Sequence, residues 1–294
     1  MVLFETLLST TNIVRIILLL IITFAYMLFD IFNKRNVPTL FAYSTLIIGI
    51  IMTFVYLNTQ IILLSFATAG IIALLGYVAY KAGQIGGADI IEFATISLII
   101  FTLKFPLLVN NFQYGFPFII SVFIATGIVA IIFVPIYYIP KAYKKKIKIY
   151  ATKQSFFNSL LISLSYLIFL AMLIYIYGLN FYITILFIII ITAAAVLIAF
   201  EKPIAETMIE YLSANELEEG DMIASSFINQ KEIKVLEKNI NFTKLVTNNM
   251  IKKMKEKKIK KKLPVYRTAI PLAVPIFFGV IISLLFGNIL LLIL

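Results

Sequence analysis

Long apolar stretches separated by short polar loops make up most of the chain. Eight of them stand out, and several reach about twenty residues, the length of helix that crosses a hydrocarbon core of roughly 30 Å. The pattern predicts an all-α polytopic membrane protein with about eight transmembrane helices. The expected spans are 13–32, 39–57, 61–80, 88–103, 116–139, 157–177, 181–200 and 268–294.

One polar stretch interrupts this pattern, at 201–267, and ten of the fourteen acidic residues lie in it. Its turn signals and lysine-rich helical part predict a small α+β subdomain on the cytoplasmic side, before the last helix. The chain is therefore divided into a transmembrane core of about seven spans (1–200), the polar subdomain (201–267) and a final transmembrane helix (268–294).

Composition supports a membrane protein and narrows the possible chemistry. Hydrophobic residues make up 62% of the chain and charged residues 13%, about half the usual charged fraction of a soluble domain. The chain has no cysteine and no histidine, so thiol nucleophiles, disulfides and the commonest metal ligand and general base are excluded. Hydrolytic chemistry would have to rest on Asp, Glu, Lys, Tyr, Ser or Thr.

Positive charge indicates the orientation in the membrane. The net charge is +11, and basic residues gather in the loops after the first, third and fifth spans and in 201–267, whereas the opposite loops (58–60, 104–114 and 178–180) carry one lysine in total. The positive-inside rule then predicts a multi-pass protein of the cell membrane with its N-terminus outside. The lysine clusters are expected to contact anionic lipid headgroups rather than nucleic acid, because no aromatic residues interleave with them.

Two aspartates are the candidate chemical groups. Asp30 ends the first span and Asp89 begins the fourth, so the orientation puts both at the cytoplasmic face, although 59 residues separate them. Two close carboxylates, one ionised and one protonated, can activate water for peptide hydrolysis. Glu92, one turn beyond Asp89, either tunes such a site or pairs with a lysine such as Lys81. Structural roles are the alternative for both aspartates: an N-cap for Asp89, and an ion pair with Lys34 for Asp30.

These residues carry a resemblance to the type IV prepilin peptidases, in particular to the archaeal preflagellin/prepilin peptidase branch of the GxGD intramembrane aspartic proteases. Gly86-Gly87-Ala88-Asp89 fits the family's pattern of glycine, any residue, hydrophobic residue and aspartate. Asp30 is followed by Lys34-Arg35-Asn36-Val37-Pro38, similar to the family's basic residue and Val-Pro after its first aspartate. Arg267-Thr268-Ala269-Ile270-Pro271 resembles, more weakly, the start of the family's last span.

The resemblance implies a function and a set of site residues. Asp30 and Asp89 would be the catalytic dyad, with Gly86, Gly87 and Ala88 as backbone support and no metal or cofactor. The substrates would be membrane-inserted pilin-like or archaellin precursors, cut on the cytoplasmic side just after a short basic leader. Without cysteines we expect no N-methyltransferase activity. The archaeal branch has six spans, so an extra hairpin is expected here, at about 157–200.

Other functions fit parts of the sequence. A GxGD protease of the presenilin or signal-peptide-peptidase type shares the second aspartate motif, but uses Tyr-Asp where this chain has Phe29-Asp30. A proton- or cation-coupled transporter would use the acids as ion ligands, and predicts acids near the middle of the membrane. A scaffold in an assembly machine is a further alternative.

Overall fold

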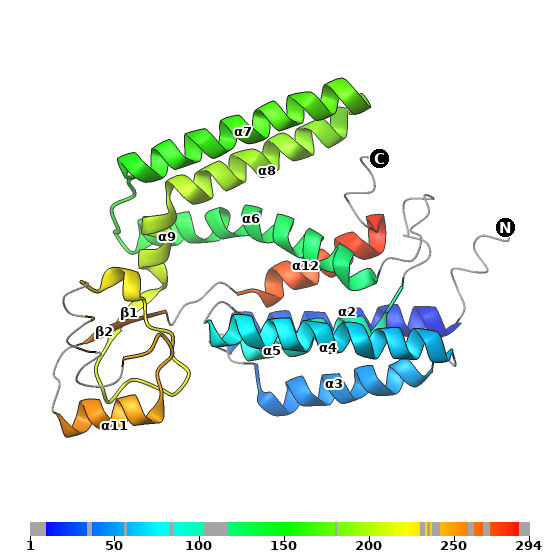
Figure 1. The fold of residues 1–294 in the computed structure, drawn as a ribbon, viewed down its shortest axis with the longest axis horizontal. Coiled ribbons are helices and arrows are strands. Elements are labelled where there is room, and N and C mark those ends of the chain that lie inside the picture. The colour runs from blue at the N-terminus through cyan, green and yellow to red at the C-terminus, as the bar shows by residue number, and fades with distance from the viewer. Residues whose placement is uncertain are drawn as a thin grey trace.

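The computed structural model describes most of the chain. The described residues are 10–33, 37–55, 58–82, 85–102, 117–179, 181–229, 233, 236, 242–257, 262–266 and 271–287. Within them the chain is mainly helical, with a small polar part at one end of a helical bundle (Figure 1). The helices are α2 (Thr10–Phe32), α3 (Thr39–Phe54), α4 (Thr59–Lys81), α5 (Gly87–Ile99), α6 (Phe118–Lys144), α7 (Lys153–Tyr177), α8 (Phe181–Ala199), α9 (Glu201–Met208), α11 (Asn248–Glu256) and α12 (Ala273–Phe286).

Five of the described helices are long and apolar enough to cross a membrane: α2, α4, α6, α7 and α8. Two more, α3 and α12, are apolar but shorter in their described parts, and α5 has 13 residues. At 1.5 Å per residue, α5 is about 20 Å long, less than the thickness of the hydrocarbon core. The predicted helical membrane architecture is therefore confirmed in outline, but eight full spans are not.

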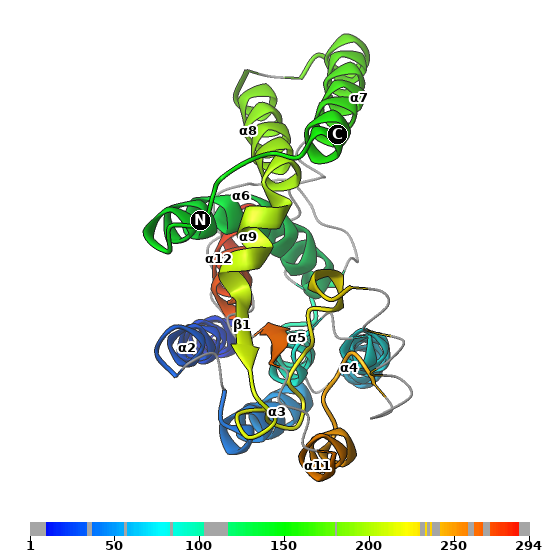
Figure 2. The ribbon, with the colours of Figure 1, turned by 90° about the vertical axis from the view of Figure 1, so that its left-hand side faces the viewer.

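The short helix α5 can lie inside the membrane region because other helices enclose it. It packs against α2, α3, α4 and α6, and the end view shows it between α2, α3 and α4 (Figure 2). Every residue from Glu92 to Phe101 is buried. Most side chains of α5 are apolar, and a helix that is hydrophobic around most of its circumference is typical of such a central position.

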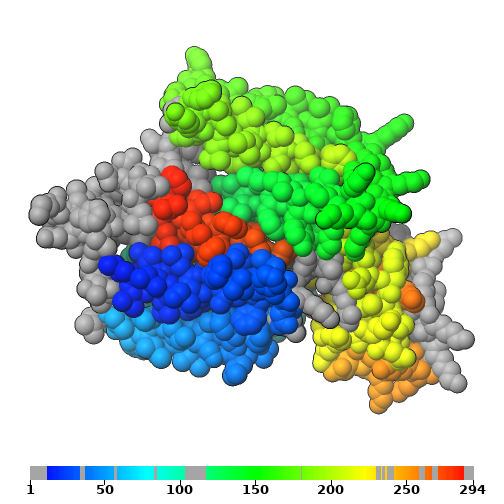
Figure 3. Space-filling model, turned by 180° about the vertical axis from the view of Figure 1, so that it is seen from behind, coloured from blue at the N-terminus to red at the C-terminus, as the bar shows by residue number. Residues whose placement is uncertain are grey.

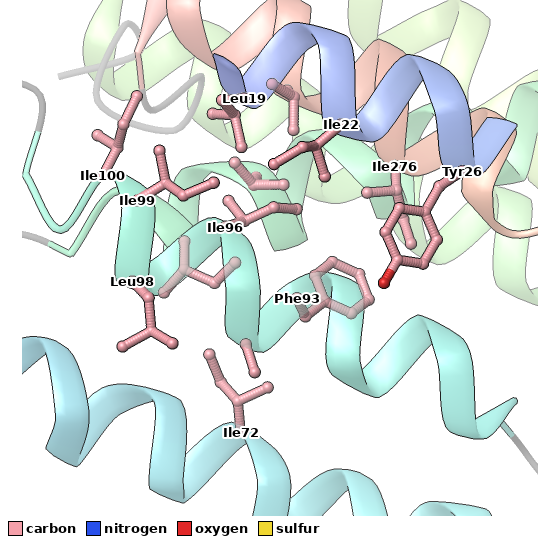
Figure 4. Close-up of a cluster of buried hydrophobic side chains, with 14 of the residues drawn as sticks. Leu19, Ile22, Tyr26, Ile72, Phe93, Ile96, Leu98, Ile99, Ile100 and Ile276 are labelled. Atoms are coloured by element: carbon pink, nitrogen blue, oxygen red, sulfur yellow. The ribbon is translucent and has the colours of Figure 1, made fainter. Parts of the chain in front are cut away.

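Close packing holds α5 in place. Side chains from α2, α4 and α12 meet it, among them Leu19, Ile72 and Ile276 (Figure 4). Gly49 of α3 and Gly76 of α4 face α5, where an added Cβ would lie 3.2 Å from Leu98 and 2.6 Å from Ile90, respectively. Small residues let helix backbones approach closely, and this contact is the main source of helix association in lipid.

The α7–α8 hairpin lies apart from α5. It packs on α6 and α9 through α8, and α12 lies between α6 and α2 (Figures 1 and 3). Most large side chains of α7 are exposed, as a surface in contact with lipid requires. This hairpin occupies the position of the extra hairpin expected from the sequence, and its principal contacts are away from the helices that carry the aspartates.

The polar subdomain contains a two-stranded antiparallel sheet. Strand β1 (Ile209–Leu212) pairs with β2 (Leu263–Tyr266), with Ile209 opposite Tyr266. A short 3-10 helix, η1 (Ser225–Phe227), and α11 complete the described part, and the buried side chains of Met250, Met254 and Val265 help form a core of its own. The mixed α and β content predicted for 201–267 is present. Strand β2 leads toward α12, which joins the subdomain to the bundle.

Candidate functional site

The helices α2 and α5 run in opposite directions, and this places Asp30 and Asp89 at the same end of the bundle. Arg15, near the start of α2, donates hydrogen bonds to the carbonyl of Ile99 at the end of α5 (3.0 Å) and to that of Met52 in α3 (2.7 Å). The last turn of α2, with Asp30, therefore lies beside the first turn of α5, with Asp89. The polar subdomain is at this end too (Figure 1).

Asp30 links α2 to the beginning of the last helix. Its side chain is 7% exposed, and its Oδ2 accepts a hydrogen bond from the backbone N–H of Ala273, the first residue of α12, at 3.1 Å. The positive end of the α12 dipole thus points at the Asp30 carboxylate and stabilises its negative charge. The sequence did not indicate this contact between residues 243 positions apart.

Asp89 closes the first turn of its own helix. Its Oδ2 accepts a hydrogen bond from the N–H of Gly86, the N-cap residue of α5, at 3.1 Å. Asp89 is partly buried, whereas Gly86 and Gly87 are exposed. A Cβ on Gly86 would lie 2.9 Å from that same Oδ2, but one on Gly87 would lie 3.9 Å from the Tyr80 ring. Asp89 therefore does cap the start of α5, as the structural alternative predicted, and the hydrogen bond from Gly86 also fixes the direction of its carboxylate.

The two aspartates interact with each other across the helix interface. Asp30 and Asp89 are close enough for their charges to repel, and Glu92 lies within the same range of both. Like charges held near one another in a region of low dielectric do not all ionise readily. An acid that can exist in both protonation states is what proton transfer to and from water requires.

Glu92 is the most enclosed of the three acids. It is 0% exposed, and neither side-chain oxygen has a hydrogen-bond partner in the part of the chain that the structure describes. The expected alternative, an ion pair with Lys81, is wrong: Lys81 is exposed at the end of α4, with its ammonium group 5.4 Å from the centre of the Tyr77 ring. Glu92 instead faces the cluster, and its charge also interacts with Tyr26 of α2.

Several residues of the predicted site lie outside the described residues. Lys34, Arg35 and Asn36 are among them, so the predicted pair of Asp30 with Lys34 is not described. The first four residues of the predicted motif at 267–271 also lie outside, and Pro271 is described just before α12.

The sequence reasoning missed Tyr26, which lies one turn from Asp30 on α2, and Arg15, which lies at the opposite end of that helix and joins it to α5 and α3. Arg15 is 3% exposed, and an intramembrane arginine is a recognisable signal that could have singled it out. The Tyr26 hydroxyl lies 2.9 Å from that of Thr45 in α3, and nothing in the local sequence separates this tyrosine from the many others.

The arrangement is suited to acid–base chemistry by carboxyl groups. Among the described residues, no group of three or more His, Cys, Asp or Glu side chains has the proximity needed to hold a metal ion. The comparison of the whole chain with protein-family models, with curated proteins and with solved structures finds no match.

Proposed function

We propose that this protein is a membrane-embedded aspartic endopeptidase that removes the short basic leader of pilin-like or archaellin precursors. The observation that carries the proposal is the position of Asp30 and Asp89, on two antiparallel helices, at the same end of an apolar bundle, where their charges interact. In the proposed orientation this end faces the cytoplasm, which is where the leader of such a precursor lies. The sequence resemblance names the substrate class.

The reaction would follow from the two protonation states of the pair. The ionised aspartate takes a proton from a water molecule as the water oxygen attacks the peptide carbonyl carbon. The protonated aspartate donates its proton to the carbonyl oxygen, and a tetrahedral diol forms. When the diol collapses, the C–N bond breaks and a C=O bond re-forms. The aspartate that took the water proton gives it to the leaving nitrogen, the other aspartate takes the proton of a diol hydroxyl, and the pair again holds one proton.

The surroundings of the pair suit such a substrate. Gly86 is exposed and has no side chain beside Asp89, so an extended substrate backbone could approach the carboxyl group there. The last two turns of α2, which also carry Asp30, line a mainly apolar, open hollow of about 530 Å³ with Leu28, Phe29 and Phe32. The hydrophobic helix that follows the leader of a precursor matches this apolar surface.

The proposal is tested by cleavage of a pilin-like precursor with the detergent-solubilised protein. We expect wild-type protein to cut after the leader, and Asp30→Asn and Asp89→Asn to be inactive, because asparagine keeps the shape but cannot exchange the proton. Glu256→Gln, an exposed acid on α11, is the matched control and should cut like wild type.

Normal cleavage by either aspartate variant would show that the dyad is wrong. The wild-type protein could instead cut no precursor but move cations across liposome membranes. If this transport requires Asp89, the proposed function is an ion transporter and not a peptidase.

A further inference from the structure

A buried acid without a protein partner lies next to the proposed dyad. Glu92 follows Asp89 by three positions on α5, so the two side chains are neighbours on one face of the helix. Both carboxyl oxygens of Glu92 are fully buried and have no hydrogen-bond partner in the described part of the chain. Polar groups in protein interiors are nearly always hydrogen-bonded, and each exception requires an explanation.

Packing alone does not explain Glu92. Burying a carboxyl group without a partner is costly, and an apolar residue of similar size would fill the same volume without this cost. Apolar side chains of α2, α3 and α4 dominate this core, and the buried hydroxyls of Thr45 and Thr53 have hydrogen-bond partners, which the Glu92 carboxyl group lacks among the described residues. A buried acid within the membrane region is by default associated with function.

The groups around Glu92 can hold a water molecule. A buried water needs two to four polar partners. Asp89 and Asp30 interact electrostatically with Glu92 from one side. Tyr26, whose hydroxyl pairs with that of Thr45, interacts with it from α2. A water bound to Glu92 on the side of these groups would have polar partners available, and two of them are the acids that would activate it.

We propose that Glu92 is a positioning residue, whose carboxyl group binds the reaction water and holds it against the Asp30–Asp89 pair. This inference rests on the proposed peptidase function. It explains why a carboxyl group is buried on α5 one turn beyond Asp89, where an apolar side chain would be less costly.

The test compares three variants of the full-length protein in the precursor cleavage assay. In Glu92→Leu no carboxyl group binds and positions the water. We therefore expect kcat to fall about 100-fold, the size of effect that a misplaced reactant can have, with little change in KM. Glu92→Gln should recover most of this loss, because an amide also binds water. Thr95→Val is the matched control, because Thr95 is fully buried one turn further along α5 with its hydroxyl also unpaired among the described residues; it should keep wild-type kcat.

Three outcomes would overturn the inference: wild-type kcat in Glu92→Leu, a change confined to KM, or an equal loss of kcat in the leucine and glutamine variants. Glu92→Met serves as a second apolar variant, and the thermal midpoint of each protein in detergent shows whether it is folded. Asp30→Asn and Asp89→Asn are measured alongside. If they cut like wild type, the proposed function fails; if they are inactive while Glu92→Leu is active, only the inference fails.

Discussion

Replacing Gly86 by alanine tests the geometry of the site with a single added methyl group. The backbone of Gly86 has φ −73° and ψ 149°, a conformation that alanine adopts without strain. The reason for glycine here is instead the space that a side chain would need. The new Cβ would lie 2.9 Å from Asp89 Oδ2, whereas non-bonded heavy atoms normally stay about 3.5 Å apart.

The expected loss of activity follows from the hydrogen bond between Gly86 and Asp89 that the methyl group disturbs. Asp89 must turn its carboxylate away by roughly half an ångström, and the 3.1 Å hydrogen bond from the Gly86 N–H then weakens. A hydrogen bond to a charged group contributes about 1.5–3 kcal/mol, and the lower value suits this partly exposed position. Since about 1.4 kcal/mol corresponds to a factor of ten in rate, kcat should fall about tenfold or more.

The assay is precursor cleavage at saturating substrate, with Gly87→Ala as the control. A Cβ on Gly87 would lie 3.9 Å from the Tyr80 ring, an ordinary van der Waals contact, so this variant should cut at close to the wild-type rate. Equal rates for Gly86→Ala and wild type would refute the idea that the carboxylate direction set by Gly86 matters. Equal losses in both variants would point to a need for glycine in the backbone instead.

Further predictions concern the stability of the bundle in detergent. Arg15→Met should lower the free energy of unfolding by about 3 kcal/mol, since carbonyls at the ends of two helices lose a charged donor; an unchanged thermal midpoint would contradict this. A double-mutant cycle of Tyr26→Phe and Thr45→Val should give a coupling energy of about 1 kcal/mol for their 2.9 Å hydrogen bond, and a value near zero would show that the bond contributes nothing. Gly279→Ala should destabilise the packing of α12 on α6 by about 1–3 kcal/mol, because its Cβ would lie 2.8 Å from the backbone nitrogen of Thr126 in α6. Gly127→Ala is the control on α6: an added Cβ has open space there, so this variant should be neutral or slightly stabilising.

The sequence predicted those parts of the fold that depend on local composition. Apolar length predicted the long helices, and the charge of the loops alone predicted a shared end for Asp30 and Asp89. The polar composition of 201–267 predicted a separate subdomain, and the structure has a small sheet there. These features follow from the preference of each segment for lipid or for water, which a single sequence displays.

What the sequence could not predict depends on which helices pack together. The fourth apolar stretch looked like a short span, but it is an enclosed helix, because α2, α3 and α4 surround it. Glu92 appeared able to reach Lys81, yet it faces inward, since the rotation of α5 is set by its tertiary contacts. Likewise, the hydrogen bond from Ala273 to Asp30 joins helices that are 243 positions apart in the sequence, and no local pattern encodes this contact.

The contact between Asp30 and the start of α12 also has a consequence for biosynthesis. Asp30 is made 243 residues before Ala273, and at about 5–20 residues per second the ribosome needs roughly 12–50 s to cover that distance. During this interval α2 can insert into the membrane, but the Asp30 carboxyl group does not yet accept the hydrogen bond from the Ala273 N–H that holds it in the finished protein. A nascent or truncated chain therefore contains both aspartates in an incomplete arrangement, and the site is completed when the last helix is in place.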